Sequence, residues 1–246
     1  MKEMWYIVCL IVLIAVYVLS VLFMNQCKHP WLVNSILIGA CLSCYVALVI
    51  IIYKDVGYAD WNFKNALPTA NVSPFMFCSL IVYIFLPKKI RKYHSVLIAL
   101  LAAGMFGAVV LACVSRAVIH YKFHFTFVLD YLSHLSLSLL GIYLVQSKQV
   151  ELRKRDCLIA GGALLTVAVI MLIVNAIFGT ACFGLALNEK YNIYNKILAP
   201  NAYFSAVIYF VGVVAVLTIG YFYVKFVVSI SSKTDKTQPD EDRAVD

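Results

Sequence analysis

The sequence contains little charge: Asp, Glu, Lys and Arg make up 13% of the 246 residues, whereas apolar residues make up 63%. Soluble globular domains are usually about 45–50% apolar and about 25% charged. This shortage of charge excludes a soluble globular domain. The mean hydropathy of +0.91 instead predicts a polytopic membrane protein.

Acidic residues are scarcer than basic ones, with 12 Asp and Glu against 20 Lys and Arg, which leaves a net charge of +8. A basic excess is also typical of nucleic-acid-binding proteins. Here, however, the Lys and Arg residues cluster beside the apolar runs, as membrane topology requires. We therefore predict no nucleic-acid binding, and we expect membrane lipids to be the partners of the chain.

The sequence also lacks the paired motifs of a metal site or a disulfide framework. Most of its 8 Cys residues fall in or at the ends of apolar runs, where a free Cys behaves as a small apolar residue. Cys41 and Cys44 form a CxxC with no second pair. His120 and His124 have no acidic residue between them. We therefore predict no metal and no cofactor.

The apolar runs predict an all-α bundle of about seven transmembrane helices in a single domain, residues 1–228. The first run has a longer apolar core than a signal peptide and no small-residue cleavage site after it, so we interpret it as a membrane helix. The polar residues 229–246 predict a disordered cytoplasmic tail. The expected spans are 5–23, 31–53, 74–86, 95–114, 125–146, 157–178 and 203–224.

The distribution of Lys and Arg predicts the orientation of these spans. Roughly two thirds of these residues follow the first, third, fifth and seventh spans. The positive-inside rule then places the N-terminus outside and the C-terminus in the cytoplasm of a multi-pass protein of the cell membrane. The two longer polar loops, 54–72 and 179–202, are extracytoplasmic on this topology.

The fifth span, 125–146, is long enough to cross a bilayer and still contains two ionisable side chains, Asp130 and His134. Their spacing of four residues places both on one helix face. The Asp130 carboxylate is then positioned to accept a hydrogen bond from one imidazole nitrogen and to leave the other free to take a proton. Because charged groups within a span are costly, this pair is the first candidate for a functional site.

Other unusual polar residues fall in the same extracytoplasmic half. Cys78 lies about five residues into the third span, and Asn175 lies near the end of the sixth. Arg116 and His124 lie at the outer ends of the fourth and fifth spans. One outward-facing polar cavity accommodates them all. Two alternatives are open for Arg116. It would bind a lipid phosphate in this cavity, or it would only extend its charged end to the membrane surface.

Cys78 is the candidate nucleophile, because a thiol reacts once a neighbouring His deprotonates it. On the expected span starts, Cys78 and His134 differ in depth by roughly 6 Å, which permits contact. Two alternatives stay open. Cys78 would be an inert buried thiol, or Asp130 and His134 would serve only in hydrogen bonds between helices.

Three stretches, PFMFC, DYLSHLSLSLLGIYL and NAIFGTACFGL, resemble the YwaF-type bacterial integral membrane family. Its animal relatives, the transmembrane protein 164 proteins, are regarded as membrane acyltransferases that act on phospholipids through a cysteine. The resemblance implies that Cys78 is that cysteine and that His134 and Asn175 belong to the site. Met76 stands where the family motif has a histidine, and Ala181 and Cys182 replace an Asn-Tyr pair.

Three functions follow from these residues. The first is a lipid acyltransferase or lipid hydrolase with Cys78 as nucleophile, His134 as base and Asp130 orienting His134. The second is a proton-coupled transporter that uses Asp130 and His134 as a relay, although the sequence shows no clear internal repeat and no matching pair of broken helices. The third is a non-catalytic membrane protein that binds a lipid in the same cavity.

Overall fold

The computed structural model describes residues 4–24, 26–27, 29–54, 72–118, 125–178, 183 and 202–234. The described chain is helical and contains no strand. The helices, in chain order, are α1 (Met4–Met24), α2 (Pro30–Lys54), α3 (Val72–Tyr83), α4 (Lys88–Val118), α5 (Phe125–Gln146), α6 (Lys154–Phe178) and α7 (Ala202–Thr234).

Six of these seven helices are long and apolar enough to cross a membrane. The exception is α3, whose 12 residues give a length of about 18 Å against a hydrocarbon core of about 30 Å. The prediction of an all-α polytopic bundle is therefore confirmed. The third predicted span, 74–86, corresponds to α3, which begins two residues earlier and ends three residues earlier because the chain turns at residues 84–87.

Two further boundaries differ from the sequence prediction. Helix α4 begins at Lys88, seven residues before the predicted span, because its basic first turns lie at the edge of the bundle, where charge is solvated. Helix α7 continues to Thr234, so the first residues of the predicted tail, 229–234, are helical. Residues 235–246 lie outside the described part.

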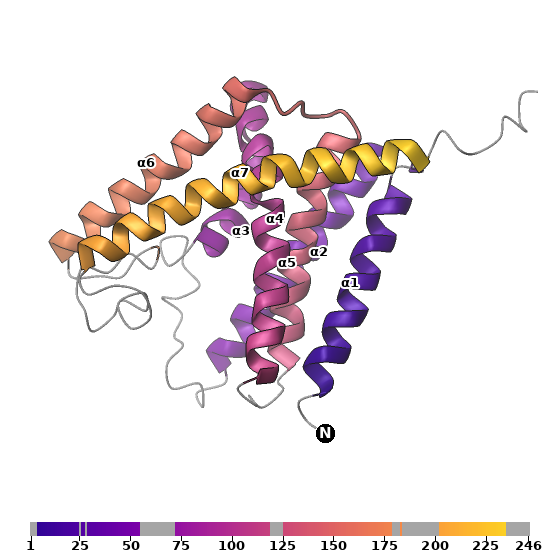
Figure 1. Ribbon diagram of the computed structural model, residues 1–246, viewed down its shortest axis with the longest axis horizontal. Helices are drawn as coiled ribbons and strands as arrows, with labels where there is room; N and C mark the ends of the chain where they lie inside the picture. The colour runs from indigo at the N-terminus through magenta and orange to yellow at the C-terminus, as the bar shows by residue number, and fades with distance from the viewer. Residues whose placement is uncertain are drawn as a thin grey trace, which may run out of the picture.

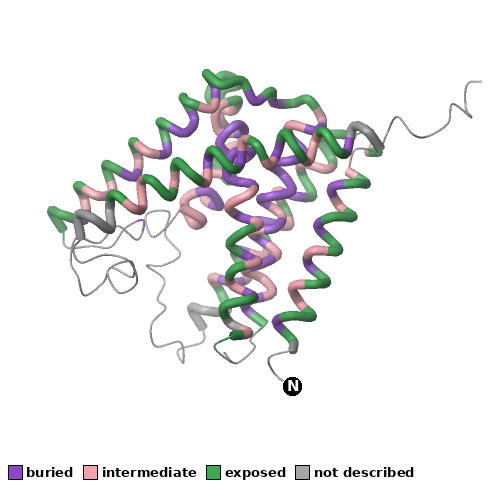
Figure 2. Tube along the Cα trace, in the orientation of Figure 1, coloured by how far each residue is buried: buried purple, intermediate pink, exposed green. Residues whose placement is uncertain are grey.

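Helices α4 and α5 form the centre of the bundle. Helix α5 packs against α4 on one side and α2 on the other, and α1 contacts both α4 and α5. Figure 1 shows α1, α2, α4 and α5 running side by side, with α7 crossing them and α6 inclined away. Buried residues concentrate on α4 and α5, and the outer helices are largely exposed on their apolar faces (Figure 2). This pattern is that of a protein whose outer surface faces lipid.

Small residues permit the closest helix contacts. A Cβ placed on Gly141 of α5 would lie 2.7 Å from the carbonyl oxygen of Ile98 and 3.0 Å from the Ala102 side chain, both on α4. A Cβ on Gly220 of α7 would collide with the carbonyl oxygen of Leu100. Small residues at such positions let helix backbones approach closely in membranes. Helix α4 is therefore fixed by α5 on one face and by α7 on another.

A hydrogen-bonded chain links four helices inside the bundle. The Ser138 hydroxyl donates to the carbonyl oxygen of Ala102 at 2.7 Å. The Tyr17 hydroxyl on α1 lies 2.7 Å from Ser138 Oγ and 3.0 Å from the Tyr223 hydroxyl on α7. Polar side chains in membrane helices commonly hold helices together in this way.

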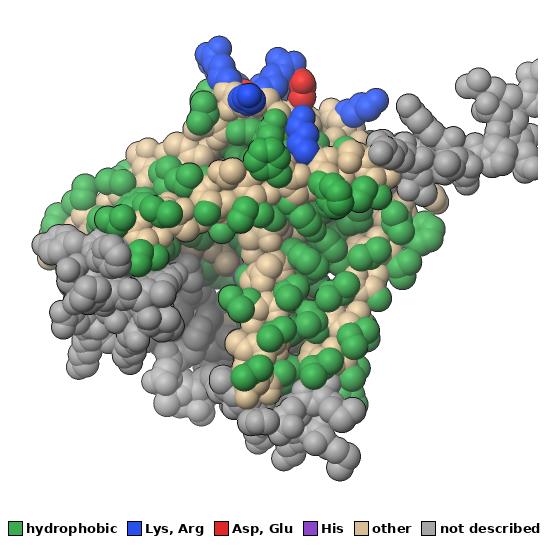
Figure 3. Space-filling model, viewed as in Figure 1, with side chains coloured by type: hydrophobic (Ala, Val, Ile, Leu, Met, Phe, Trp, Pro, Cys, Tyr) green, Lys and Arg blue, Asp and Glu red, His purple; other side chains and the backbone are tan. Residues whose placement is uncertain are grey.

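Among the side chains that the structure describes, Lys and Arg gather at one end of the molecule, seen at the top of Figure 3. This end contains the first turns of α4 and α6, the α5–α6 connection, and Lys225 of α7. Two ion pairs lie here, Lys92 with Asp156 at 2.7 Å and Arg153 with Glu151 at 2.7 Å. The positive-inside rule predicts that this end is cytoplasmic. The cations described there are Lys88, Lys89, Arg91, Lys92, Lys148, Arg153, Lys154, Arg155 and Lys225.

Candidate functional site

Asp130 and His134 are in contact on α5. Nδ1 of His134 lies 2.8 Å from the backbone carbonyl oxygen of Asp130 and 3.3 Å from Oδ1 of its carboxylate. Both partners are acceptors, so we infer that Nδ1 carries the ring proton. The other ring nitrogen, Nε2, is then an acceptor in the neutral imidazole. Helical spacing alone brings this pair together.

The residue that meets Nε2 is Ser73, in the first turn of α3. Its hydroxyl oxygen lies 3.0 Å from Nε2 of His134 and donates the hydrogen bond, because Nε2 has no proton to give. The three side chains follow one another as hydroxyl, imidazole and carboxylate. We call this arrangement the Ser73–His134–Asp130 chain. The same order of groups activates the hydroxyl nucleophile of serine hydrolases.

Helix α3 is held in position by its contacts with α4. Ser79 Oγ lies 2.7 Å from Nε2 of His94, and the Tyr83 hydroxyl lies 3.0 Å from Ser95 Oγ. Arg91 donates to the carbonyl oxygens of residues 84 and 86 at 2.7 and 2.9 Å, which closes the turn between the two helices. These contacts determine the depth of α3 and hence the place of its first turn.

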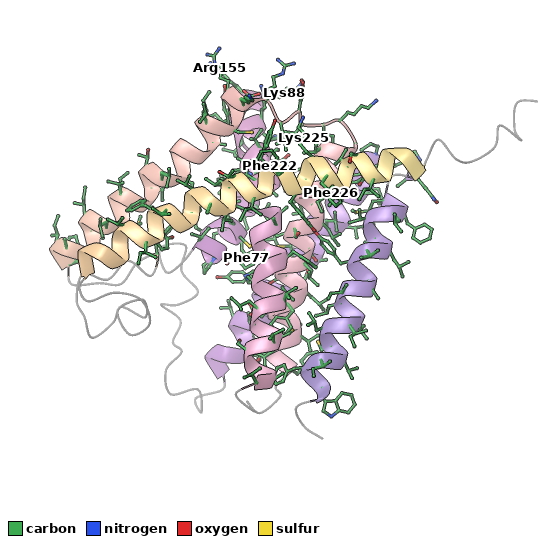
Figure 4. All side chains as sticks on the ribbon, in the orientation of Figure 1. Phe77, Lys88, Arg155, Phe222, Lys225 and Phe226 are labelled. Atoms are coloured by element: carbon green, nitrogen blue, oxygen red, sulfur yellow. The ribbon has the colours of Figure 1, made fainter. Side chains whose placement is uncertain are left out.

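The imidazole of His134 is packed by aromatic rings. Phe77 of α3 meets it edge-on, with ring centroids 5.3 Å apart and an interplanar angle of 86°. Tyr45 of α2 packs against Phe77 at 4.5 Å. Phe77 lies between α3 and the α4–α5 pair in Figure 4. The His134 side chain is 13% exposed and that of Asp130 is 34% exposed, so the base is enclosed while the carboxylate reaches the edge of the site.

Ser73 also lines a cavity of about 440 Å³ between α3, α4, α6 and α7. Its walls are almost entirely apolar, and the small residues Ala108 and Gly212 leave the space open. A Cβ on Gly212 would meet no atom within 4 Å. Ligand cavities usually measure about 300–1,000 Å³, so this volume suits an acyl chain. We call it the acyl cavity; its other walls include Leu101, Met105, Leu164, Val213 and Val216.

The structure places Cys78 on α3, half-buried, five residues beyond Ser73. Side chains five residues apart point roughly 140° apart around a helix axis. Cys78 is close enough to Tyr45 of α2 to interact electrostatically with it. Ser73, not Cys78, is therefore the residue on α3 that forms the hydrogen bond to His134.

The remaining candidates are spread more widely. Asn175 is buried on α6, which packs against α4 and α7. His124 and the side chain of Arg116 lie outside the described part of the chain. Among the described residues, no group of three or more His, Cys, Asp and Glu side chains is arranged to hold a metal ion.

Sequence reasoning had identified Asp130 and His134 but not Ser73. Ser73 immediately precedes Pro74, at the start of the third predicted span, and Ser and Thr are common at helix starts. Ser73 and Phe77 are four residues apart, so they lie on the same face of α3. That spacing is the sequence feature that links Ser73 to the face of α3 in contact with His134.

No protein-family model, curated protein or solved structure matches this chain. The fold itself defines the class: a multi-pass α-helical membrane protein. Within that class its distinguishing feature is a hydroxyl, an imidazole and a carboxylate joined inside the bundle beside an apolar cavity.

Proposed function

We propose that this protein is a lipid hydrolase or acyltransferase of the cell membrane, with Ser73 as its nucleophile, His134 as its general base and Asp130 as the residue that positions His134. One observation carries the proposal: the Ser73–His134–Asp130 chain ends at a hydroxyl that lines the apolar acyl cavity. The proposal keeps the reaction class expected from the sequence and transfers the nucleophilic role from Cys78 to Ser73.

The reaction would take place in two balanced steps. Ser73 Oγ attacks the carbonyl carbon of a lipid ester while its proton passes to Nε2 of His134. The lipid alcohol leaves with that proton, and an acyl ester remains on Ser73. Water, or the hydroxyl of a second lipid, then gives its proton to His134 and attacks the ester, which releases the acyl group and restores Ser73.

Asp130 supports both steps through His134. Its backbone and side-chain oxygens hold Nδ1–H and so keep Nε2 directed at Ser73. The carboxylate also stabilises the positive charge that appears on the imidazole after proton transfer. The first turn of α3, which carries Ser73, provides partial positive charge where the oxyanion develops.

The depth of the site determines how far a lipid substrate would have to enter the bundle. His134 lies nine residues after the start of α5, or about 13 Å from the extracytoplasmic end of that helix. At that depth His134 lies near the middle of the hydrocarbon core, so a phospholipid ester would have to move inward from the headgroup boundary to reach Ser73, with an acyl chain in the acyl cavity. Asp130, one turn closer to the extracytoplasmic end, faces the side from which the headgroup would enter.

A fluorophosphonate probe with a long alkyl chain tests the proposal, because such probes phosphonylate activated serine hydroxyls. We expect labelling of Ser73 in the purified protein, identified by peptide mass. Ser73→Ala and His134→Gln should reduce labelling by at least about a thousandfold, and Asp130→Asn by less, as in other triads. Cys78→Ala is the matched control on the same helix and should label normally.

A chain-length comparison adds a second criterion. Gly212→Leu fills the acyl cavity without meeting other atoms at its Cβ, so it should block the long-chain probe and spare a methyl-chain probe. Labelling of Cys78 instead of Ser73, or a folded protein that takes up neither probe, would overturn the proposal. Proton-driven solute flux that requires His134 in vesicles would favour the transporter instead.

A further inference from the structure

A second cavity lies between α6 and α7, on the opposite face of α7 from the acyl cavity. Its volume is about 490 Å³. Leu158, Gly162 and Leu165 of α6 form one wall, and Val214, Leu217 and Tyr221 of α7 form the other. The acyl cavity meets α7 at residues 208, 209, 212, 213 and 216, so the two cavities use different faces of that helix. We call the second cavity the α6–α7 groove.

The groove is open to the lipid-facing surface. Two of its lining residues, Leu158 at 77% and Val214 at 48%, are exposed large apolar side chains. Gly162 leaves space in one wall, because a Cβ there would meet no atom within 4 Å. An open apolar groove at membrane depth is filled by an acyl chain, since water has no polar partners there.

The cytoplasmic mouth of the groove has a lysine on each side. Lys154, in the first turn of α6, is one of its lining residues. Lys225 of α7 lies one turn beyond Tyr221, with its ammonium 5.7 Å from the Tyr221 ring centroid. Lys225 also lies near Cys157, another lining residue of α6. Figure 4 shows Lys225 at the same end of the molecule as Lys88 and Arg155.

Neither lysine forms an ion pair within the described part of the chain. The nearby carboxylates are already engaged, Asp156 by Lys92 and Glu151 by Arg153. Both ammonium groups are therefore available to an anion. A cation on each side of an apolar groove is complementary to one kind of molecule, which combines a negative headgroup with a hydrocarbon chain.

We propose that the α6–α7 groove binds an anionic phospholipid of the cytoplasmic leaflet, with its phosphate between Lys154 and Lys225 and one acyl chain along Gly162. The N-terminus of α6, which begins at Lys154, adds partial positive charge beside the phosphate. This site is separate from the Ser73–His134–Asp130 chain, and it does not depend on the proposed acyl transfer.

Lipid retention measured by native mass spectrometry tests the site. The purified protein is equilibrated with equal amounts of phosphatidylglycerol and phosphatidylcholine, and the retained lipids are compared. Wild type should prefer phosphatidylglycerol. Lys154→Ala and Lys225→Ala should each lower that preference about fivefold, as expected for one cation at an anionic membrane surface. Lys154→Arg should preserve it.

Two controls make the result specific. Lys148→Ala removes an exposed cation from the same end but away from the groove, and it should leave the preference unchanged. Gly162→Leu should displace both lipids, whereas Gly107→Leu, at another exposed position with no atom within 4 Å of a Cβ, should displace neither. Inorganic phosphate at constant ionic strength should not compete, because it has no acyl chain.

Three outcomes would overturn the proposal. An unchanged preference in the Lys154→Ala/Lys225→Ala protein would mean that the headgroup lies elsewhere. An equal loss in Lys148→Ala would mean diffuse attraction to surface charge. Unchanged lipid retention in folded Gly162→Leu protein would mean that the acyl chain does not occupy the groove.

Discussion

Two helix pairs in this protein are packed very differently. In the membrane segment of α5, 67% of the residues are buried, and the helix packs closely against α4. In the membrane segments of α6 and α7 only 22% and 17% of the residues are buried, and a cavity lies on each side of α7. The close packing of helices α4 and α5, which we call the close pair, holds Asp130 and His134 in a fixed position on α5. The cavities beside helices α6 and α7, which we call the open pair, leave the kind of space that a lipid chain needs. The difference separates the Ser73–His134–Asp130 chain on α3 and α5 from the α6–α7 groove.

The largest effect should come from Gly220, the point where the open pair rests on α4. In Gly220→Ala the new Cβ would overlap the Leu100 carbonyl oxygen, and backbone cannot yield as a side chain can. We expect a loss of at least about 3 kcal/mol in the free energy of unfolding, measured by denaturant titration in detergent. Gly212→Ala, on the same helix in open space, should unfold normally. Equal stability of the two variants would mean that α7 does not rest on α4 as described.

A smaller effect is expected at the close contact between α4 and α5. Gly141→Ala places a Cβ 2.7 Å from the Ile98 carbonyl oxygen, so α5 must shift, at a cost of about 1–3 kcal/mol. Gly162→Ala makes the same change in the open pair and should be neutral or stabilising by up to about 1 kcal/mol, because Ala favours helix. Thermal unfolding of both proteins measures the difference. A destabilised Gly162→Ala protein would contradict the openness of the α6–α7 groove.

Ser138 should contribute less than either glycine contact. Ser138→Ala removes hydrogen bonds to Ala102 and Tyr17 inside the bundle, and we expect a loss of about 0.6–2 kcal/mol in unfolding free energy. Tyr17→Phe removes one of the same bonds. If the two residues act through one network, the double variant should lose less than the sum of the single losses. Strict additivity would exclude that coupling.

The smallest effect should follow a change on the lipid-facing surface of α7. Phe222 is 66% exposed, and Phe222→Leu replaces one lipid-facing apolar side chain with another. We expect a change of less than about 0.5 kcal/mol in unfolding free energy. A large destabilisation would show that this face of α7 is covered by protein in the membrane, for example by a second copy of the chain.

Several features could be predicted from the sequence because they depend on short-range geometry. The contact between Asp130 and His134 follows from their spacing on one helix, and six long apolar helices follow from six long apolar runs. The short length of the third span was also predicted, but its end was placed three residues too late because residues 84–86 are apolar although the chain turns there.

The partner of His134 could not be predicted in the same way. Ser73 and His134 are 61 positions apart, and their contact depends on the depth and rotation of α3. A rotation of one residue, about 100°, would present a different side chain to the imidazole. The Ser79–His94 and Tyr83–Ser95 contacts determine that rotation, and both are contacts between different helices.

Amino-acid order alone was sufficient for the membrane class and the pairing of Asp130 with His134, because hydropathy and helical periodicity are local properties. Packing between helices decided which hydroxyl meets His134 and where the two cavities lie. The physical reason is that a membrane helix is apolar on nearly every face, so its sequence does not specify the face it presents to a neighbour. That choice is made by close contacts such as those at Gly141 and Gly220.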